Sequence, residues 1–263
     1  MADAPSNLAV TTRDSVLRVR IDRAEKRNAL STTVLAEIAE VFRTHAADSM
    51  LKAAVLTGAG DKAFAAGGDL REFAGIRDEK GARELFEGAS RALESVRSFP
   101  VPVVAALNGL AVGGGAELAV ACDFRIAARH AAIGFVQARL NISSGFGGGT
   151  DLMRLLGPSR ALQCALRAEV FPAERAQAMG LVDEVAGEGE TLDDCVARFL
   201  EPMLRQAPQV IRSYKAMALA ERLGLPAERR WQTERDGMVT TWVHPDHWAA
   251  ADRALDRDRD GSK

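Results

Sequence analysis

The sequence predicts an α/β fold for about the first two-thirds of the chain, followed by a helical C-terminal region. Short apolar strands such as Ala53–Gly60 alternate with segments whose apolar residues have helical spacing, such as Leu85–Val96. This alternation is typical of sheets covered by helices. Beyond about Thr191 the chain reads as consecutive helices. Three prolines stand near the expected helix starts, at Pro208, Pro226 and Pro245.

The elements follow one another in a regular order. Val16–Asp22 alternates apolar and basic residues, which predicts a half-buried strand, and Val34–Phe42 has the apolar spacing of a helix capped by Ser31. Val101–Asn108 is a second buried strand. Two further strands are expected at Asp123–Ala128 and Ala132–Val136. We place a boundary between residues 194 and 195, with a core before it and a helical region over 195–263.

Composition limits the class of protein. The chain has 263 residues, 47% of them hydrophobic, and a formal net charge of −2 without a basic block. A nucleic-acid partner is therefore not expected. We expect no signal peptide, because the first residues contain an early acid and no apolar stretch, and no membrane span, because Pro102, Asn108 and glycines interrupt the longest apolar run. The three cysteines are far apart in the sequence, so no metal site is expected either. A cytoplasmic protein is the resulting expectation.

The stretch Gly109–Phe124 holds the first candidate site. It contains Gly113, Gly114 and Gly115, then Glu117 in an otherwise apolar run. The glycines follow a strand and precede good helix formers, so they sit at a helix N-terminus with unpaired N–H groups. Side chains lean toward the helix N-terminus, so Glu117 can lie beside an atom that the Gly114 N–H holds. The alternative is structural: an acid in a first helical turn complements the helix dipole.

A second stretch, Ala63–Phe73, repeats the pattern. Gly67 and Gly68 follow a buried strand, and Asp69 opens a short helix or caps it. A second free N–H, that of Gly68, would give the pair of donors that an enolate or a tetrahedral oxyanion requires.

Four segments together carry a family resemblance. They are Arg23–Ser31, Ala63–Leu70, Asn108–Ala128 and Ala207–Lys215. In this order and spacing the chain resembles the enoyl-CoA hydratase/isomerase (crotonase) superfamily over roughly residues 8 to 257. The resemblance implies a spiral of ββα units, a helical trimerisation region and an assembly of one or two trimers. It also implies an acyl-CoA substrate. Coenzyme A would then be part of the substrate, so no separate cofactor is expected.

The resemblance also assigns roles to residues. It implies that the N–H groups of Gly68 and Gly114 hold the thioester oxygen and that Glu117 handles water or a proton. It places the adenine end of coenzyme A against Ala29, Leu30 and Ala66, beside Asp69. Arg23 and Lys26 would lie near the phosphates.

The chain departs from the family pattern at Gln137. Hydratases of this family use a second glutamate, and alignment on Gly145, Gly147 and Gly148 places Gln137 there. Glutamine cannot exchange a proton near neutral pH. The segments Ala207–Arg212 and Glu234–Trp242 also resemble the ethylmalonyl-CoA decarboxylase branch. We therefore expect a hydratase-like lyase. The alternatives are a decarboxylase of a 2-substituted malonyl-CoA, an isomerase, and a degenerate member of the family that only binds coenzyme A.

Other motifs are weaker. Gly58–Ala63 fits a dinucleotide fingerprint, but further glycines fall where its helix should run. Asn141–Gly145 resembles a nucleophile elbow without its strand–serine–helix turn. His244 and His247 lack an evident third metal ligand. We interpret these three as structural.

Overall fold

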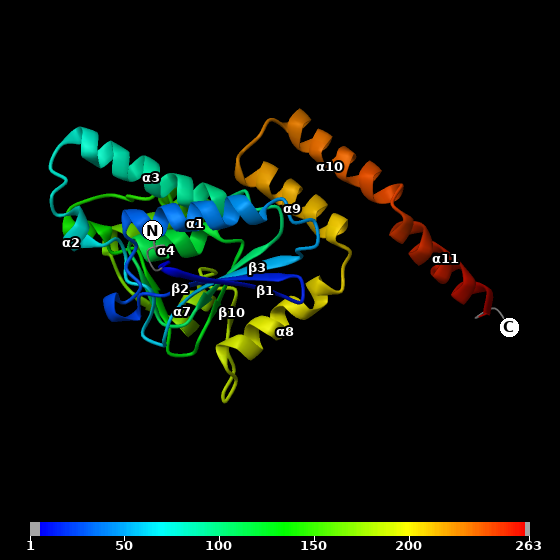
Figure 1. Ribbon diagram of the computed structural model, residues 1–263, viewed down its shortest axis with the longest axis horizontal. Coiled ribbons are helices and arrows are strands. Elements are labelled where there is room, and N and C mark those ends of the chain that lie inside the picture. The colour runs from blue at the N-terminus through cyan, green and yellow to red at the C-terminus, as the bar shows by residue number, and fades with distance from the viewer. Residues whose placement is uncertain (1–5, 261–263) are drawn as a thin grey trace, which may run out of the picture.

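The protein is built on two sheets (Figure 1), in a computed structural model that describes residues 6–260. The main sheet has the order β1-β2-β3-β5-β7-β10, and only β1 runs antiparallel to its neighbour. Its strands are β1 (Leu8–Arg13), β2 (Val16–Ile21), β3 (Ala53–Gly58), β5 (Val103–Leu107), β7 (Phe124–Ala127) and β10 (Glu184–Val185). The small sheet has the order β4-β6-β8-β9. It consists of β4 (Ala63–Ala65), β6 (Leu110–Val112), β8 (Ala132–Gly134) and β9 (Phe171–Pro172).

Successive strands are shared between the two sheets. The first strand of each pair lies in the main sheet and the second in the small sheet, and a helix follows each pair. The pairs are β3–β4, β5–β6 and β7–β8. These ββα units confirm the expected fold. The short strands β4 and β6 were not predicted as strands, because three residues are too few to show an alternating pattern.

Helices α1 (Thr32–His45) and α3 (Glu79–Arg97) cover one side of the main sheet (Figure 1). Ser31 caps α1, since its hydroxyl accepts the Val34 N–H at 3.2 Å, as expected. The apolar face of α1 ends in Phe42, whose ring meets Phe99 edge-on with 5.1 Å between ring centroids. These contacts join the helices to the largest apolar core of the molecule.

Shorter helices complete the body of the molecule. They are η1 (Ala24–Lys26), α2 (Leu70–Phe73), α4 (Gly114–Ala121), η2 (Gln137–Leu140), α5 (Gly149–Leu156), α6 (Pro158–Arg167) and α7 (Ala173–Ala178). Helix α4 is buried along its whole length, which fits its nearly unbroken apolar sequence.

Helix α8 (Leu192–Leu204) belongs to the body as well. Cys195, Val196 and Leu200 are buried against main-sheet residues that include Val55 and Val104. The boundary that we expected between residues 194 and 195 therefore falls inside a helix that packs on the sheet.

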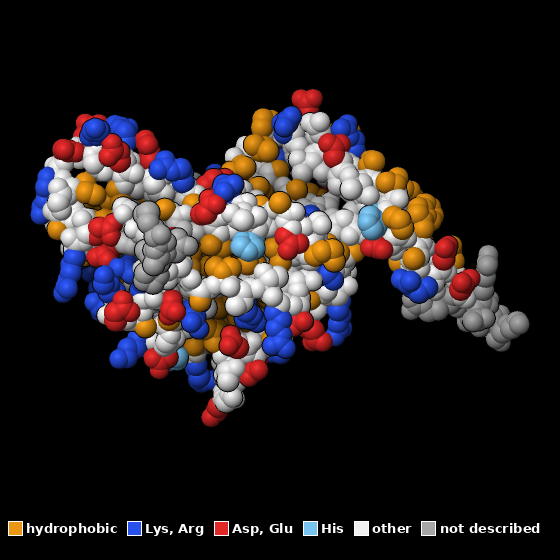
Figure 2. Space-filling view, in the orientation of Figure 1, with side chains coloured by type: hydrophobic (Ala, Val, Ile, Leu, Met, Phe, Trp, Pro, Cys, Tyr) orange, Lys and Arg blue, Asp and Glu red, His pale blue; other side chains and the backbone are white. Residues whose placement is uncertain are grey.

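Three long helices end the described chain. Helices α9 (Pro208–Arg222), α10 (Ala227–Trp242) and α11 (Pro245–Asp260) begin at or directly after the three prolines named above, as expected. Helix α11 extends away from the body (Figure 1). Hydrophobic side chains gather on the visible face of α10 and α11 (Figure 2), and Trp231, Trp242 and Trp248 are all exposed. Among the described helices, none combines the length and the apolar composition needed to cross a membrane.

The packing of α4 gives a stability prediction. A Cβ at Gly115 would overlap the carbonyl oxygen of Ala65, so we expect Gly115→Ala to lower the free energy of unfolding by roughly 1–3 kcal/mol. The control is Gly88→Ala inside α3, where only the Arg91 side chain lies within 4 Å of the new Cβ. That change should raise the free energy of unfolding by roughly 0.5–1 kcal/mol. Urea denaturation measures both values, and equal effects would contradict this packing.

Candidate active site

Two glycine turns meet at one edge of the small sheet. The parallel strands β4 and β6 lead into them, so both turns leave the sheet at the same edge. Gly67 has φ +97° and Gly113 has φ +56°, conformations that favour glycine. A Cβ on Gly67 would lie 3.8 Å from the nitrogen of Gly114. The two turns are therefore in direct contact.

Each turn presents a backbone N–H without an acceptor. Gly114 is the first residue of α4, so its N–H has no partner within the helix. Outside the helices and strands, no hydrogen bond of the described residues uses the N–H of Gly68 or of Gly114. Two free donors on adjoining turns suit an oxygen that gains negative charge, and the dipole of α4 adds to the attraction.

The ring of Phe146 covers both turns. A Cβ on Gly114 would overlap this ring, and a Cβ on Gly68 would lie 3.2 Å from its Cζ atom. Phe146 is only 5% exposed, and its ring also meets Phe73 edge-on. A side chain at position 114 would displace this ring, so a substitution there changes the packing even where the N–H donor is kept.

Glu117 lies one helical turn beyond Gly114 and is 1% exposed. Its carboxylate accepts five hydrogen bonds. The donors are Gln137 Nε2 at 2.6 Å, Ser144 Oγ at 2.7 Å, and the N–H groups of Gly145 at 3.0 Å, Phe146 at 2.9 Å and Gly148 at 2.8 Å. A buried charge is tolerated only when it is paired or hydrogen-bonded, and these donors supply that compensation. Since a carboxylate has about four lone-pair positions, a water molecule can reach this acid only by displacing one of the five donors.

The loop 144–148 is built around this carboxylate. A Cβ on Gly148 would overlap Cα and Cβ of Glu117, so the loop backbone lies directly against the acid. Ser144 both donates to Glu117 and accepts the Gly149 N–H at 2.9 Å, which fixes its hydroxyl proton toward the acid. The sequence showed the glycines of this loop, but Ser144 was missed because nothing in its spacing points to Glu117.

Gln137 stands where the second acid was expected. It begins η2, and its amide nitrogen is turned toward Glu117. The amide can hold and orient the carboxylate, but it cannot exchange a proton with a substrate. The structure therefore brings Gln137 onto Glu117, one helical turn from Gly114, and Gly68 lies on the adjoining turn under the same Phe146 ring.

A cleft of about 660 Å³ opens beside Gly68. It is lined by residues that the family resemblance assigned to coenzyme A, namely Arg23, Lys26, Ala29, Ala66 and Asp69, together with Arg27 and Arg71. Leu30, assigned to the same role, is fully buried and does not line the cleft. Arg27 and Arg71 are exposed cations to which no sequence pattern pointed. Lysine and arginine side chains gather at the α2 end of the visible face (Figure 2).

Arg23 and Asp69 pair with each other in this cleft. Arg23 is buried, and its guanidinium donates to the carbonyl of Ala29 at 2.5 Å and to Asp69 at 3.2 Å. Burial raises the pKa of Asp69, but the Glu72 N–H and Arg23 outweigh it, so this pKa lies below its ordinary value. Asp69 also caps α2, as expected. Lys26, Arg27 and Arg71 are therefore the more accessible cations.

Comparison with known proteins identifies the family of the chain. A family model described as enoyl-CoA hydratase/isomerase matches residues 11–248. The chain is 34% identical to a crotonyl-CoA hydratase of Syntrophomonas wolfei over 82% of each chain. It is 31% identical to a carnitinyl-CoA dehydratase of Escherichia coli over 89% of this chain and 87% of that protein.

A solved structure gives the same result. The crystal structure of an enoyl-CoA hydratase from Bacillus anthracis superposes with a TM-score of 0.88 at 30% identity, covering 95% of this chain and 96% of that one. The chain therefore belongs to the enoyl-CoA hydratase/isomerase family, and it is an enzyme of the hydratase-like lyase kind.

Proposed function

We propose that this enzyme adds water to a 2-enoyl-CoA thioester, or removes it in the reverse direction, with Glu117 as its single acid–base group. The observation that carries the proposal is one buried carboxylate, fixed by five donors, a helical turn away from a free N–H. The relatives named above as crotonyl-CoA hydratase and carnitinyl-CoA dehydratase support the same class of reaction.

The proposed reaction begins at the thioester carbonyl. Its oxygen accepts the N–H groups of Gly68 and Gly114, which draws electron density from the conjugated double bond. Since the Phe146 ring covers both glycines, it has to rotate away as the thioester enters. The cations Lys26, Arg27 and Arg71 lie on the neighbouring cleft, where the phosphates of coenzyme A would be held.

One carboxylate suffices for both proton transfers. Glu117 takes a proton from water while the water oxygen bonds to Cβ of the substrate, and the negative charge moves to the thioester oxygen as an enolate. The protonated Glu117 then returns this proton to Cα, which restores the carbonyl and the carboxylate. The elements of one water molecule are thereby added to one face of the double bond, and Gln137 orients the acid throughout. No cofactor apart from the coenzyme A of the substrate takes part.

The products of three substrates separate this reaction from its alternatives. The enzyme is incubated separately with crotonyl-CoA, ethylmalonyl-CoA and methylmalonyl-CoA, and the masses of the products are measured by mass spectrometry. We expect crotonyl-CoA to gain the mass of one water. Loss of carbon dioxide from either malonyl thioester would instead favour the decarboxylase. Unchanged masses of all three would favour an isomerase, which changes no mass, or a protein that only binds coenzyme A.

Glu117→Gln tests the acid directly. We expect kcat to fall by roughly 10²–10⁴-fold, because the amide cannot transfer a proton. The NH₂ group of the new glutamine would face the N–H and O–H donors that now surround the carboxylate and could not accept hydrogen bonds from them. This costs roughly 1–3 kcal/mol of folding stability, so folding is checked by circular dichroism. Glu87→Gln, the same change on an exposed part of α3, is the control and should leave kcat unchanged. Near-complete activity of Glu117→Gln would show that the acid serves only the structure.

We further propose that the chain assembles as a trimer or as a dimer of trimers. The exposed apolar side chains of α10 and α11, among them Val239, Trp242 and Trp248, support this proposal, since exposure of such large groups is costly for a monomer. Sedimentation velocity should therefore give a trimer or a hexamer at micromolar concentration. A stable monomer would contradict the proposal.

A cytoplasmic location also remains a proposal. It is supported by the three cysteines, Cys122, Cys164 and Cys195, which are all free and buried, as is usual where thiols stay reduced.

A further inference from the structure

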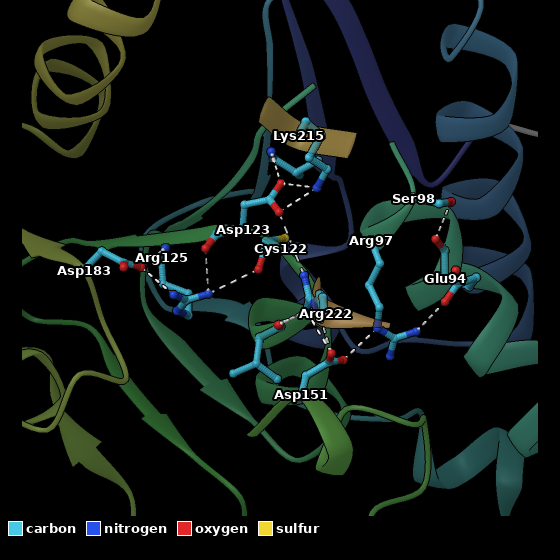
Figure 3. Close-up of polar contacts among 12 residues, drawn as sticks. Glu94, Arg97, Ser98, Cys122, Asp123, Arg125, Asp151, Asp183, Lys215 and Arg222 are labelled. Atoms are coloured by element: carbon cyan, nitrogen blue, oxygen red, sulfur yellow. Dashed lines mark hydrogen bonds and ion pairs between the residues drawn. The ribbon is translucent and has the colours of Figure 1, made fainter. Parts of the chain in front are cut away.

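An alternating chain of charges lies behind the active site (Figure 3). It runs through Lys215, Asp123, Arg222, Asp151, Arg97 and Glu94, and we call these six residues the ion chain. Asp151 is its centre and is 3% exposed. It accepts Arg97 Nε at 2.7 Å and Arg222 Nε at 3.0 Å. Buried ion pairs contribute little net stability compared with apolar side chains, so stability alone does not account for the ion chain.

Each arginine of this centre also holds a backbone carbonyl of the active site. Arg222 donates to the carbonyl of Val120 at 2.5 Å, on the helix α4 that carries Gly114 and Glu117. Arg97 donates to the carbonyl of Gly147 at 3.1 Å, on the loop that supplies donors to Glu117. Asp151 therefore links the element that carries the acid to the loop that holds it.

The loop has two opposite faces. Its N–H groups at Gly145, Phe146 and Gly148 are turned toward Glu117. Two of its carbonyls are turned toward α3, where Gly147 meets Arg97 and Phe146 meets the Ser90 hydroxyl at 3.4 Å. Because a peptide plane is rigid, a contact that fixes the carbonyl also fixes the N–H of the next residue. The bond from Arg97 to Gly147 therefore aims the Gly148 N–H at the acid.

We propose that Arg97 is a positioning residue, which acts on Glu117 through the loop 144–148 and is itself held by Asp151. The effect on turnover rests on the proposed role of Glu117, whereas the effect on the loop does not. Arg97 has no contact with the cleft beside Gly68, so it should influence the chemical step and not the binding of coenzyme A.

Arg97→Lys is the test. Lysine keeps a cation for Asp151, but a single ammonium group cannot reproduce the separate arms that reach Asp151 and Gly147. We expect kcat to fall about tenfold, with KM changed less than about twofold, because small displacements of a reacting group cost rate. We also expect faster amide hydrogen exchange in residues 144–149, measured by mass spectrometry.

Arg125→Lys is the matched control. Arg125 is also buried, pairs with Asp183 at 2.6 Å and donates to the carbonyls of Leu181 at 2.9 Å, Cys122 at 3.2 Å and Asp123 at 3.3 Å. It therefore reaches the end of α4 and, like Arg97, the ion chain, but among the described residues it has no bond to the loop 144–148. We expect it to lower stability comparably while kcat and exchange in residues 144–149 stay unchanged. Ser90→Ala is a milder second variant, which should lower kcat about two- to threefold and loosen the same loop.

The readouts separate this proposal from the proposed function. Equal kcat and equal loop exchange in Arg97→Lys and Arg125→Lys would overturn the positioning role, as would a change confined to KM. Should Arg97→Lys prove unstable, unchanged loop exchange and kcat in Ser90→Ala would overturn it instead. Full activity of Glu117→Gln would contradict only the proposed function. The effect of Arg97 on amide hydrogen exchange in the loop would still stand, because that exchange is measured without substrate turnover.

Discussion

The buried carboxylate of Glu117 is the constraint on which the site depends. A charge taken out of water costs several kcal/mol unless hydrogen bonds replace its hydration. Here the replacement comes from Gln137 after β8 and from the loop 144–148, segments distant from α4 in the sequence. The acid can therefore be buried only when both segments are in place, so the fold and the site depend on each other.

The three glycines before Glu117 serve three different physical needs. Gly113 adopts a positive φ at the start of α4, Gly114 lies under the Phe146 ring, and Gly115 lets α4 approach the carbonyl of Ala65. Together they bring a bare helix N-terminus and an acid to the edge of the small sheet. This explains why a stretch so unfavourable for an ordinary helix stands beside a lone carboxylate.

Periodic features were predictable from the sequence, and irregular ones were not. The strands β2 and β3 begin where the apolar pattern begins, and Ser31 caps α1 as its position suggested. The glycine segments with Glu117 could be found because they combine an unusual composition with fixed spacing. The pairing of Arg23 with Asp69, and the contacts of Ser144 and Asp151, join residues at least 27 positions apart in the chain. No local pattern encodes such pairs, so the sequence left Arg23 as a candidate for phosphate contact.

The most direct test of the account is proton exchange at Cα of a saturated thioester. Butyryl-CoA has no double bond to hydrate, so deuterium uptake from heavy water reports only the enolate and the group that moves its proton. We expect the enzyme to incorporate deuterium at Cα, and we expect Glu117→Gln to slow this uptake by at least about 10²-fold. Equal uptake by the two proteins would contradict the assignment of Glu117 as the proton-transferring group.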